Sequence, residues 1–168
     1  MIERYREWYE HERDCNAKML QMIAGVPTEK KGTEKFAQAV QLAHHLAACR
    51  ENWLDRMDSE GKRQVDWWPE GLKEKDLRHR FDKLEARWGH YLSTLTDRDL
   101  AGDFEFPASN GRRYRWSIEG QIVQLVGHAF YHRGQIALLV NELGGETDDT
   151  DYLFWAYQRN PRYGEITT

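Results

Sequence analysis

The sequence is short of cysteine, proline and long apolar runs. Its 168 residues include only two cysteines and four prolines, too few cysteines for the disulfide framework of a small secreted domain. No apolar stretch approaches the roughly 20 residues that span a bilayer, and the charged residues 1–14 lack the apolar core of a signal peptide. We therefore expect a cytoplasmic protein with no membrane partner.

The sequence also lacks an excess of positive charge. Lys and Arg number 24 against 28 Asp and Glu, which gives a net charge of −4 with neutral histidines. A nucleic-acid surface needs clustered positive charge, whereas basic and acidic residues alternate here, as in residues 73–76. Such mixing is typical of a solvated helix surface, and we expect no nucleic-acid partner.

Helical periodicity is the dominant pattern in the sequence. Apolar residues recur every three or four positions in four long segments, namely Tyr5–Ile23, Thr33–Met57, Leu72–Leu95 and Ser117–Leu143. Gly144-Gly145 is a natural end for the last of them. The pattern predicts one domain, residues 1–168, that is all-α and built as a four-helix bundle.

One short segment departs from this period. Aromatic residues alternate on either side of Asn110-Gly111, at Phe104, Phe106, Tyr114 and Trp116. This arrangement predicts a two-stranded β-hairpin before the last helix. After that helix, the apolar cluster Tyr152–Trp155 is expected to pack back onto the bundle.

His128 and His132 lie four residues apart on the apolar face of the fourth helix, so both rings project to the same side. Buried imidazoles need partners. A shared metal ion is one solution, and hydrogen bonds to carbonyls or a carboxylate are another. Ala129 stands where the metalloprotease pattern has Glu, which excludes that class.

A third ligand must come from another helix. His44 and His45 are the candidates, and periodicity does not choose between them. His79 and His90 are predicted to face water, and His11 lies at the margin of the first helix's inner face.

The segment Gly127–Ile136 resembles the HxxxHRGQ signature of the DinB/YfiT-like family of small bacterial metalloproteins. The run from His45 to Trp53 resembles that family's second-helix element, and this register selects His45 over His44. Asn16 resembles the Asn of a first-helix motif, although Asp14-Cys15 replace the usual Trp-Ala. The resemblance implies an up-down-down-up bundle, a metal site of His45, His128 and His132, and a homodimer.

The resemblance implies no single reaction. Family members resemble S-transferases that use low-molecular-weight thiols, and others are described as metal-dependent hydrolases. We therefore expect a small-thiol S-transferase acting on an electrophilic small molecule, with a hydrolase using metal-bound water or a non-catalytic dimeric metal-binding module as alternatives. Three imidazoles with an open position suit a catalytic ion. Zinc and nickel are the expected ions, and iron and manganese also accept such ligands.

Several residues are candidates for positioning the metal ligands or for acid–base chemistry beside the ion. Gln135 shares the face of His128 and is predicted to be a hydrogen-bond donor to the site. Glu12 and Asn16 fall on the inner stripe of the first helix, where Glu12 could be a general base, a fourth ligand or the neutraliser of an arginine. Arg133 is predicted to anchor a carboxylate from a neighbouring helix or a partner subunit.

Other residues concern the substrate. Arg113 on the hairpin, with its neighbours Arg112 and Arg115, could bind a thiol cofactor. Trp67-Trp68 could rim a substrate pocket, form a lid or contact a partner subunit. Cys15 and Cys49 are expected to be small buried hydrophobic residues.

Overall fold

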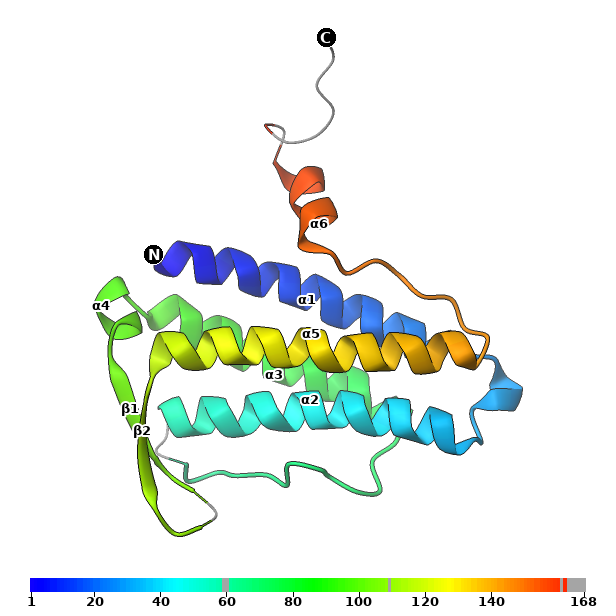
Figure 1. Ribbon diagram of the computed structural model, residues 1–168, viewed down its shortest axis with the longest axis horizontal. Coiled ribbons are helices and arrows are strands. Elements are labelled where there is room, and N and C mark those ends of the chain that lie inside the picture. Colours follow the sequence, from blue (N-terminus) through cyan, green and yellow to red (C-terminus); the bar gives the residue numbers. More distant parts are fainter. Residues whose placement is uncertain (59–60, 109, 161, 163–168) are drawn as a thin grey trace.

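The computed structural model describes residues 1–58, 61–108, 110–160 and 162. Four long helices lie side by side (Figure 1), namely α1 (Ile2–Ala24), α2 (Glu34–Asp58), α3 (Glu74–Thr94) and α5 (Ile118–Glu142). Helix α2 packs against α3 and α5, and α1 packs against the same two helices. Short elements complete the described fold, namely η1 (Thr28–Lys30), α4 (Asp97–Leu100) and α6 (Tyr152–Arg159). The prediction of a mainly helical chain is confirmed.

The apolar stripes of the long helices meet in a common core. On α3, Leu77, Phe81, Leu84 and Trp88 are buried at helical spacing, as predicted. Each such side chain contributes about 1.5–3 kcal/mol when it leaves water. Helix α2 is buried around its whole girth from 42 to 50, because other parts of the chain cover it on several sides. This position brings polar residues of α2 into the interior.

The predicted end of the last long helix is confirmed. Gly144 has a φ of +80°, in the left-handed region that glycine adopts most easily. The next N–H, that of Gly145, donates to the carbonyl of Val140, which satisfies one of the free carbonyls at the helix end. At the other end, the Ser117 hydroxyl accepts from the N–H of Gly120, a regular N-cap.

The predicted hairpin is also confirmed. Strands β1 (Asp103–Pro107) and β2 (Arg113–Ser117) pair antiparallel. The hairpin leans on the carboxyl-terminal part of α2, where Trp53 makes edge contacts with Phe104 and Phe106. A two-stranded ribbon is marginal by itself, and these aromatic contacts attach it to the helices.

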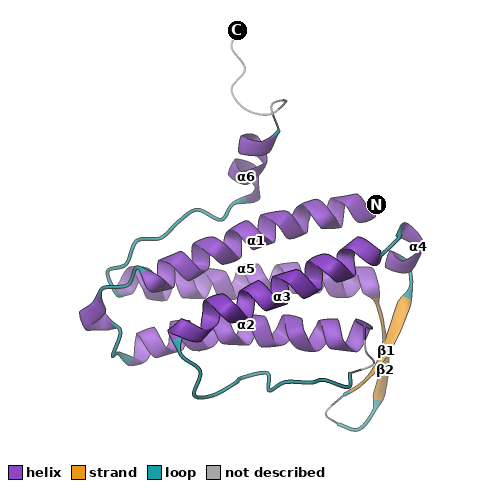
Figure 2. Ribbon diagram, turned by 180° about the vertical axis from the view of Figure 1, so that it is seen from behind, coloured by secondary structure: helices purple, strands orange, loops and turns teal. Residues whose placement is uncertain are grey.

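The connection from α2 to α3 determines what surrounds the middle of α2. Helix α3 begins near the end of the molecule opposite to where α2 finishes, so the connection runs back along the outside of α2 (Figures 1 and 2). Its described part, residues 61–73, carries Trp67 and Trp68. An extended segment with two large aromatic rings therefore passes the mid-point of the helix.

The carboxyl-terminal helix α6 projects away from α1 (Figure 1). Trp155 and Ala156 are buried, whereas Leu153 and Phe154 are about half exposed. The prediction that residues 152–155 pack onto the bundle is confirmed for Trp155 and wrong for Leu153 and Phe154, because one side of α6 faces away from the other helices. Among the described residues, no helix combines the length and the apolar character that crossing a membrane requires.

Candidate metal centre

Three histidine rings from two helices converge between α2 and α5. The centre of the His45 ring lies 5.3 Å from that of His128 and 5.0 Å from that of His132, and the last two are 4.5 Å apart. Around one tetrahedral zinc ion with bonds of about 2.0–2.1 Å to nitrogen, imidazole centres lie roughly 5 Å apart. The three side chains thus fit a single divalent ion.

Cys49, which was predicted to be a small buried hydrophobic residue, lies with the three histidines. Donor atoms of His45, Cys49 and His128 all lie within 4.8 Å of one another. Cys49 Sγ is 3.5 Å from Nε2 of His45 and 4.0 Å from Nε2 of His128, and a tetrahedral zinc ion would hold sulfur and nitrogen about 3.5 Å apart. The signal that could have found Cys49 is its spacing of four residues from His45.

The distances between ring centres include His132 in the cluster, whereas the distances between donor atoms do not. The His132 ring lies among the others, but the donor-atom set contains Cys49 in its place. Rotation of an imidazole ring moves its donor atoms more than its centre. His132 and Cys49 therefore both lie beside the space between the His45 and His128 rings.

His45 is held in one orientation by the α2–α3 connection. Its Nδ1 lies 2.7 Å from the carbonyl oxygen of Trp67. Because a carbonyl oxygen only accepts, Nδ1 carries the proton and Nε2 keeps its lone pair for an ion. The indole of Trp68 stacks on the same imidazole, with ring centres 3.6 Å apart and planes 5° from parallel. The backbone of Trp67 and the side chain of Trp68 therefore both lie beside the candidate metal centre.

His132 is held in a similar way by Gln135. Its Nδ1 lies 2.7 Å from Oε1 of Gln135, so the ring donates and the amide oxygen accepts. The predicted contact of Gln135 with the site is present, but the prediction that Gln135 donates was wrong, because its amide nitrogen is directed to the hydroxyl of Tyr131. Such partners orient metal-binding histidines and increase their basicity.

Burial favours the uncharged form of His45 and His128. Burial is the largest cause that lowers the pKa of His128, and with the neighbouring His132 and His45 it brings this pKa to about 4. It also lowers the pKa of His45, against the opposing effect of the bond to Trp67. Neutral imidazole is the form that binds metal. Burial raises the pKa of the Cys49 thiol to about 12, so this thiol carries its proton at neutral pH.

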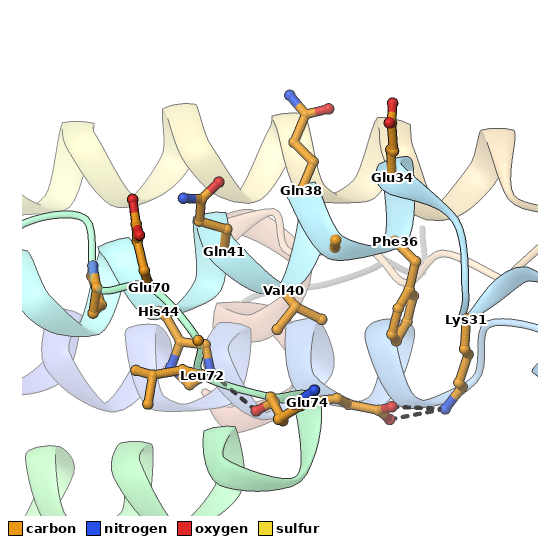
Figure 3. A pocket seen from close by; sticks show the side chains of 14 residues that line it. Lys31, Glu34, Phe36, Gln38, Val40, Gln41, His44, Glu70, Leu72 and Glu74 are labelled. Carbon is orange, nitrogen blue, oxygen red and sulfur yellow. Dashed lines mark hydrogen bonds and ion pairs between the residues drawn. The ribbon is translucent and has the colours of Figure 1, made fainter.

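His44 points to a different place. Its Nε2 lies 3.1 Å from the carbonyl oxygen of Lys73, and its Nδ1 lies 3.3 Å from a guanidinium nitrogen of Arg80. It lines a hollow of about 540 Å³ between α2 and residues 69–74, which the ion pair of Lys31 and Glu74 borders (Figure 3). The choice that periodicity left open is thus settled in favour of His45.

The sequence matches the DinB family over residues 1–163. The chain belongs to the DinB family. A comparison with curated proteins gave no match. The family match extends over the helices that carry all three histidines and Cys49, so the resemblance first seen in residues 127–136 covers nearly the whole chain.

In this DinB family member, Glu12 and Asn16 lie in a charged cluster between α1, α2 and α5. The Glu12 carboxylate pairs with Arg50 and lies 3.9 Å from Arg133, and Asn16 Oδ1 accepts from Arg133 at 3.1 Å. Of the three roles considered for Glu12, this geometry gives the neutraliser of an arginine. Arg133 holds a carboxylate of a neighbouring helix, as predicted.

Arg113 lies on the hairpin of the DinB chain and is exposed, 3.6 Å from Glu105. The hairpin ends at Ser117, and about 16 Å of helix separates that residue from His128. The structure therefore does not bring Arg113 to the histidine rings, and the prediction that it binds a cofactor gains no support.

The bond between Gln135 and His132 leads to a first prediction. We expect Gln135→Ala to weaken zinc binding by about 10–100-fold, the usual effect of removing a partner of a metal-binding histidine. Competition with a coloured chelator measures this change. Gln124→Ala is the control, because its amide oxygen accepts from Gln121 on the same helix. Equal affinities of the two variants would show that Gln135 does not position the ring.

Proposed function

We propose that this protein is a metal-dependent enzyme that transfers a small thiol to an electrophilic small molecule, with zinc or nickel held by His45, His128 and His132. The observation that carries the proposal is the convergence of three imidazole rings from α2 and α5, with centres at the spacing that a single ion requires. A bound ion would supply Lewis acidity that favours the thiolate form of a thiol.

The proposed reaction forms one bond and breaks one bond. The thiol loses its proton to solvent, its sulfur forms a bond to an electrophilic carbon, and the leaving group departs with the electron pair of the broken bond. Trp67 fixes the position of His45 through its carbonyl, and the Trp68 indole covers one face of that ring. The Trp68 side chain favours an apolar or aromatic electrophile over a highly charged one.

Cobalt substitution in a Cys49→Ala variant tests the proposal. We expect the cobalt-loaded variant to show a thiolate-to-cobalt charge-transfer band in the near ultraviolet only after a small thiol is added. We also expect zinc- or nickel-loaded protein, incubated with thiol and an alkylating electrophile, to form a thioether that mass spectrometry detects. Removal of His128 should abolish both signals.

Other outcomes would favour the alternatives. Ester cleavage without added thiol would favour a hydrolase that uses water. A charge-transfer band in the unmutated protein before thiol is added would identify Cys49 as a fourth ligand. A closed shell of four protein ligands is typical of structural sites, and that result would favour a non-catalytic metal-binding module.

The proposal includes the family's up-down-down-up four-helix bundle, a cytoplasmic location and a homodimer. Exposed apolar side chains on α5 and α6 support the dimer. Tyr131 and Leu138 are 65% and 58% exposed, and Leu153 and Phe154 are 48% and 51% exposed. Side chains of this kind are enriched in contacts between subunits.

A further inference from the structure

A second cavity lies between α1, α5 and α6. Its volume is about 270 Å³. The residues that line it are Trp8, His11, Glu12, Val126, Phe130, Arg133 and Tyr152. Most of this lining is aromatic or aliphatic, with two charged groups among the apolar ones, a composition common in sites for small organic molecules.

This cavity is separate from the metal centre because the two use different faces of α5. Val126, Phe130 and Arg133 follow one another at intervals of four and three residues and share one face. On the same helix, His128, His132 and Gln135 of the candidate metal centre follow one another at the same intervals. This series begins two positions later than Val126. Two positions correspond to about 200° around the helix, so a ligand in the cavity would not touch the ion.

The charges beside the cavity do not balance. Glu12, Arg50 and Arg133 are 4%, 6% and 3% exposed. One carboxylate thus faces two guanidinium groups, and the cluster carries one net positive charge in the interior. Arg133 Nε is buried and has no hydrogen-bond acceptor in the described part of the chain. Buried charges and donors without partners are costly, and an anion in the cavity would relieve both.

Aromatic rings provide walls for a flat ligand. The guanidinium carbon of Arg133 lies 5.1 Å from the centre of the Phe130 ring, and Phe130 and Tyr152 are partly exposed, at 41% and 36%. These two side chains therefore border both the cavity and solvent. The cavity is slightly smaller than the range of about 300–1,000 Å³ typical for drug-sized molecules, which favours a ligand with one ring.

We propose that this cavity binds a small aromatic carboxylate, with the carboxylate paired to Arg133 and the ring between Trp8, Phe130 and Tyr152. A cation of the same shape would be repelled by the net positive charge of the cluster. A neutral ligand would leave that charge uncompensated. The proposal does not depend on the metal centre or on its chemistry.

Three probes of one shape test it, namely benzoate, benzyl alcohol and benzylamine. In calorimetric titrations of the full chain, we expect benzoate to bind at least about tenfold more tightly than benzyl alcohol, the difference that one charge-assisted hydrogen bond provides. Benzylamine should not bind. Equal binding of the three probes, tighter binding of benzylamine, or no binding of benzoate would overturn the proposal.

Variants locate the binding without removing the buried charges. Val126→Phe fills the cavity and should abolish benzoate binding. Val123→Phe places the same ring on the exposed side of α5, where Val123 is 49% exposed, and should leave binding unchanged. Benzoate should also bind the His128→Ala variant, because the cavity does not include His128. Coordination of the carboxylate to an ion at the histidines would instead be lost in that variant. Binding that survives Val126→Phe or disappears in His128→Ala would contradict the assignment.

Discussion

Replacing His128 by alanine is expected to weaken zinc binding by more than about 100-fold, because loss of a direct ligand exceeds the effect of losing an outer-shell partner. His128 is one of three rings whose centres lie 4.5–5.3 Å apart, and no other described histidine stands in its place. The variant purified from zinc-containing medium should therefore contain little metal by elemental analysis.

His79→Ala is the matched control. His79 lies on the exposed side of α3, as predicted from its position two residues after Leu77. We expect this variant to bind zinc as tightly as the unmutated protein. If both variants kept their zinc, the ion would have to be bound outside the cluster of rings, and the proposed function would lose its basis.

The second large effect concerns stability. We expect Glu12→Gln to reduce the free energy of unfolding by about 3–5 kcal/mol, the usual cost of removing one partner from a buried ion pair. Glutamine has nearly the same shape but no charge, so Arg50 and Arg133 would remain buried without a counter-charge. For a domain of this size, the midpoint of thermal unfolding should fall by roughly 6–20 °C.

Glu10→Gln serves as the control on the same helix. Glu10 pairs with Arg13 at 3.1 Å on the exposed side of α1, and exposed pairs contribute only about 0–1 kcal/mol. Thermal unfolding of the two variants should therefore differ clearly. A Glu12→Gln variant with unchanged stability and lost activity would instead show that Glu12 acts as a base.

Features set by local sequence were predictable. The end of α5 depends on Gly144, which adopts a backbone conformation that other residues rarely take, and the stripe on α3 follows from helical spacing alone. The family signature then selected His45, His128 and His132, whose rings lie close together between α2 and α5. Each of these depends on residues within a few turns of one another or on a motif recognised as a whole.

Features that depend on contacts between distant segments were not predictable. An arginine partner for Glu12 was among the roles considered, but the order of residues does not identify it as Arg50 or Arg133, which lie on two other helices. The same holds for Trp68, whose stacking on His45 depends on the path of a long connection. Cys49 was overlooked although its spacing from His45 was visible, because a buried cysteine is usually an ordinary packing residue.

The histidines and the residues that surround them belong to different parts of the fold. The histidines belong to rigid helices with a shared core, whereas Trp67 and Trp68 belong to a segment that ends at α3 and is outside that core. Substitutions of side chains in this segment can therefore alter what approaches the histidine rings, because the bond to His45 comes from a backbone carbonyl that a change of side chain preserves. Divergence of substrate preference among proteins with this architecture is accordingly expected to accumulate in the α2–α3 connection, and exchanging it between them offers a direct route to new selectivity.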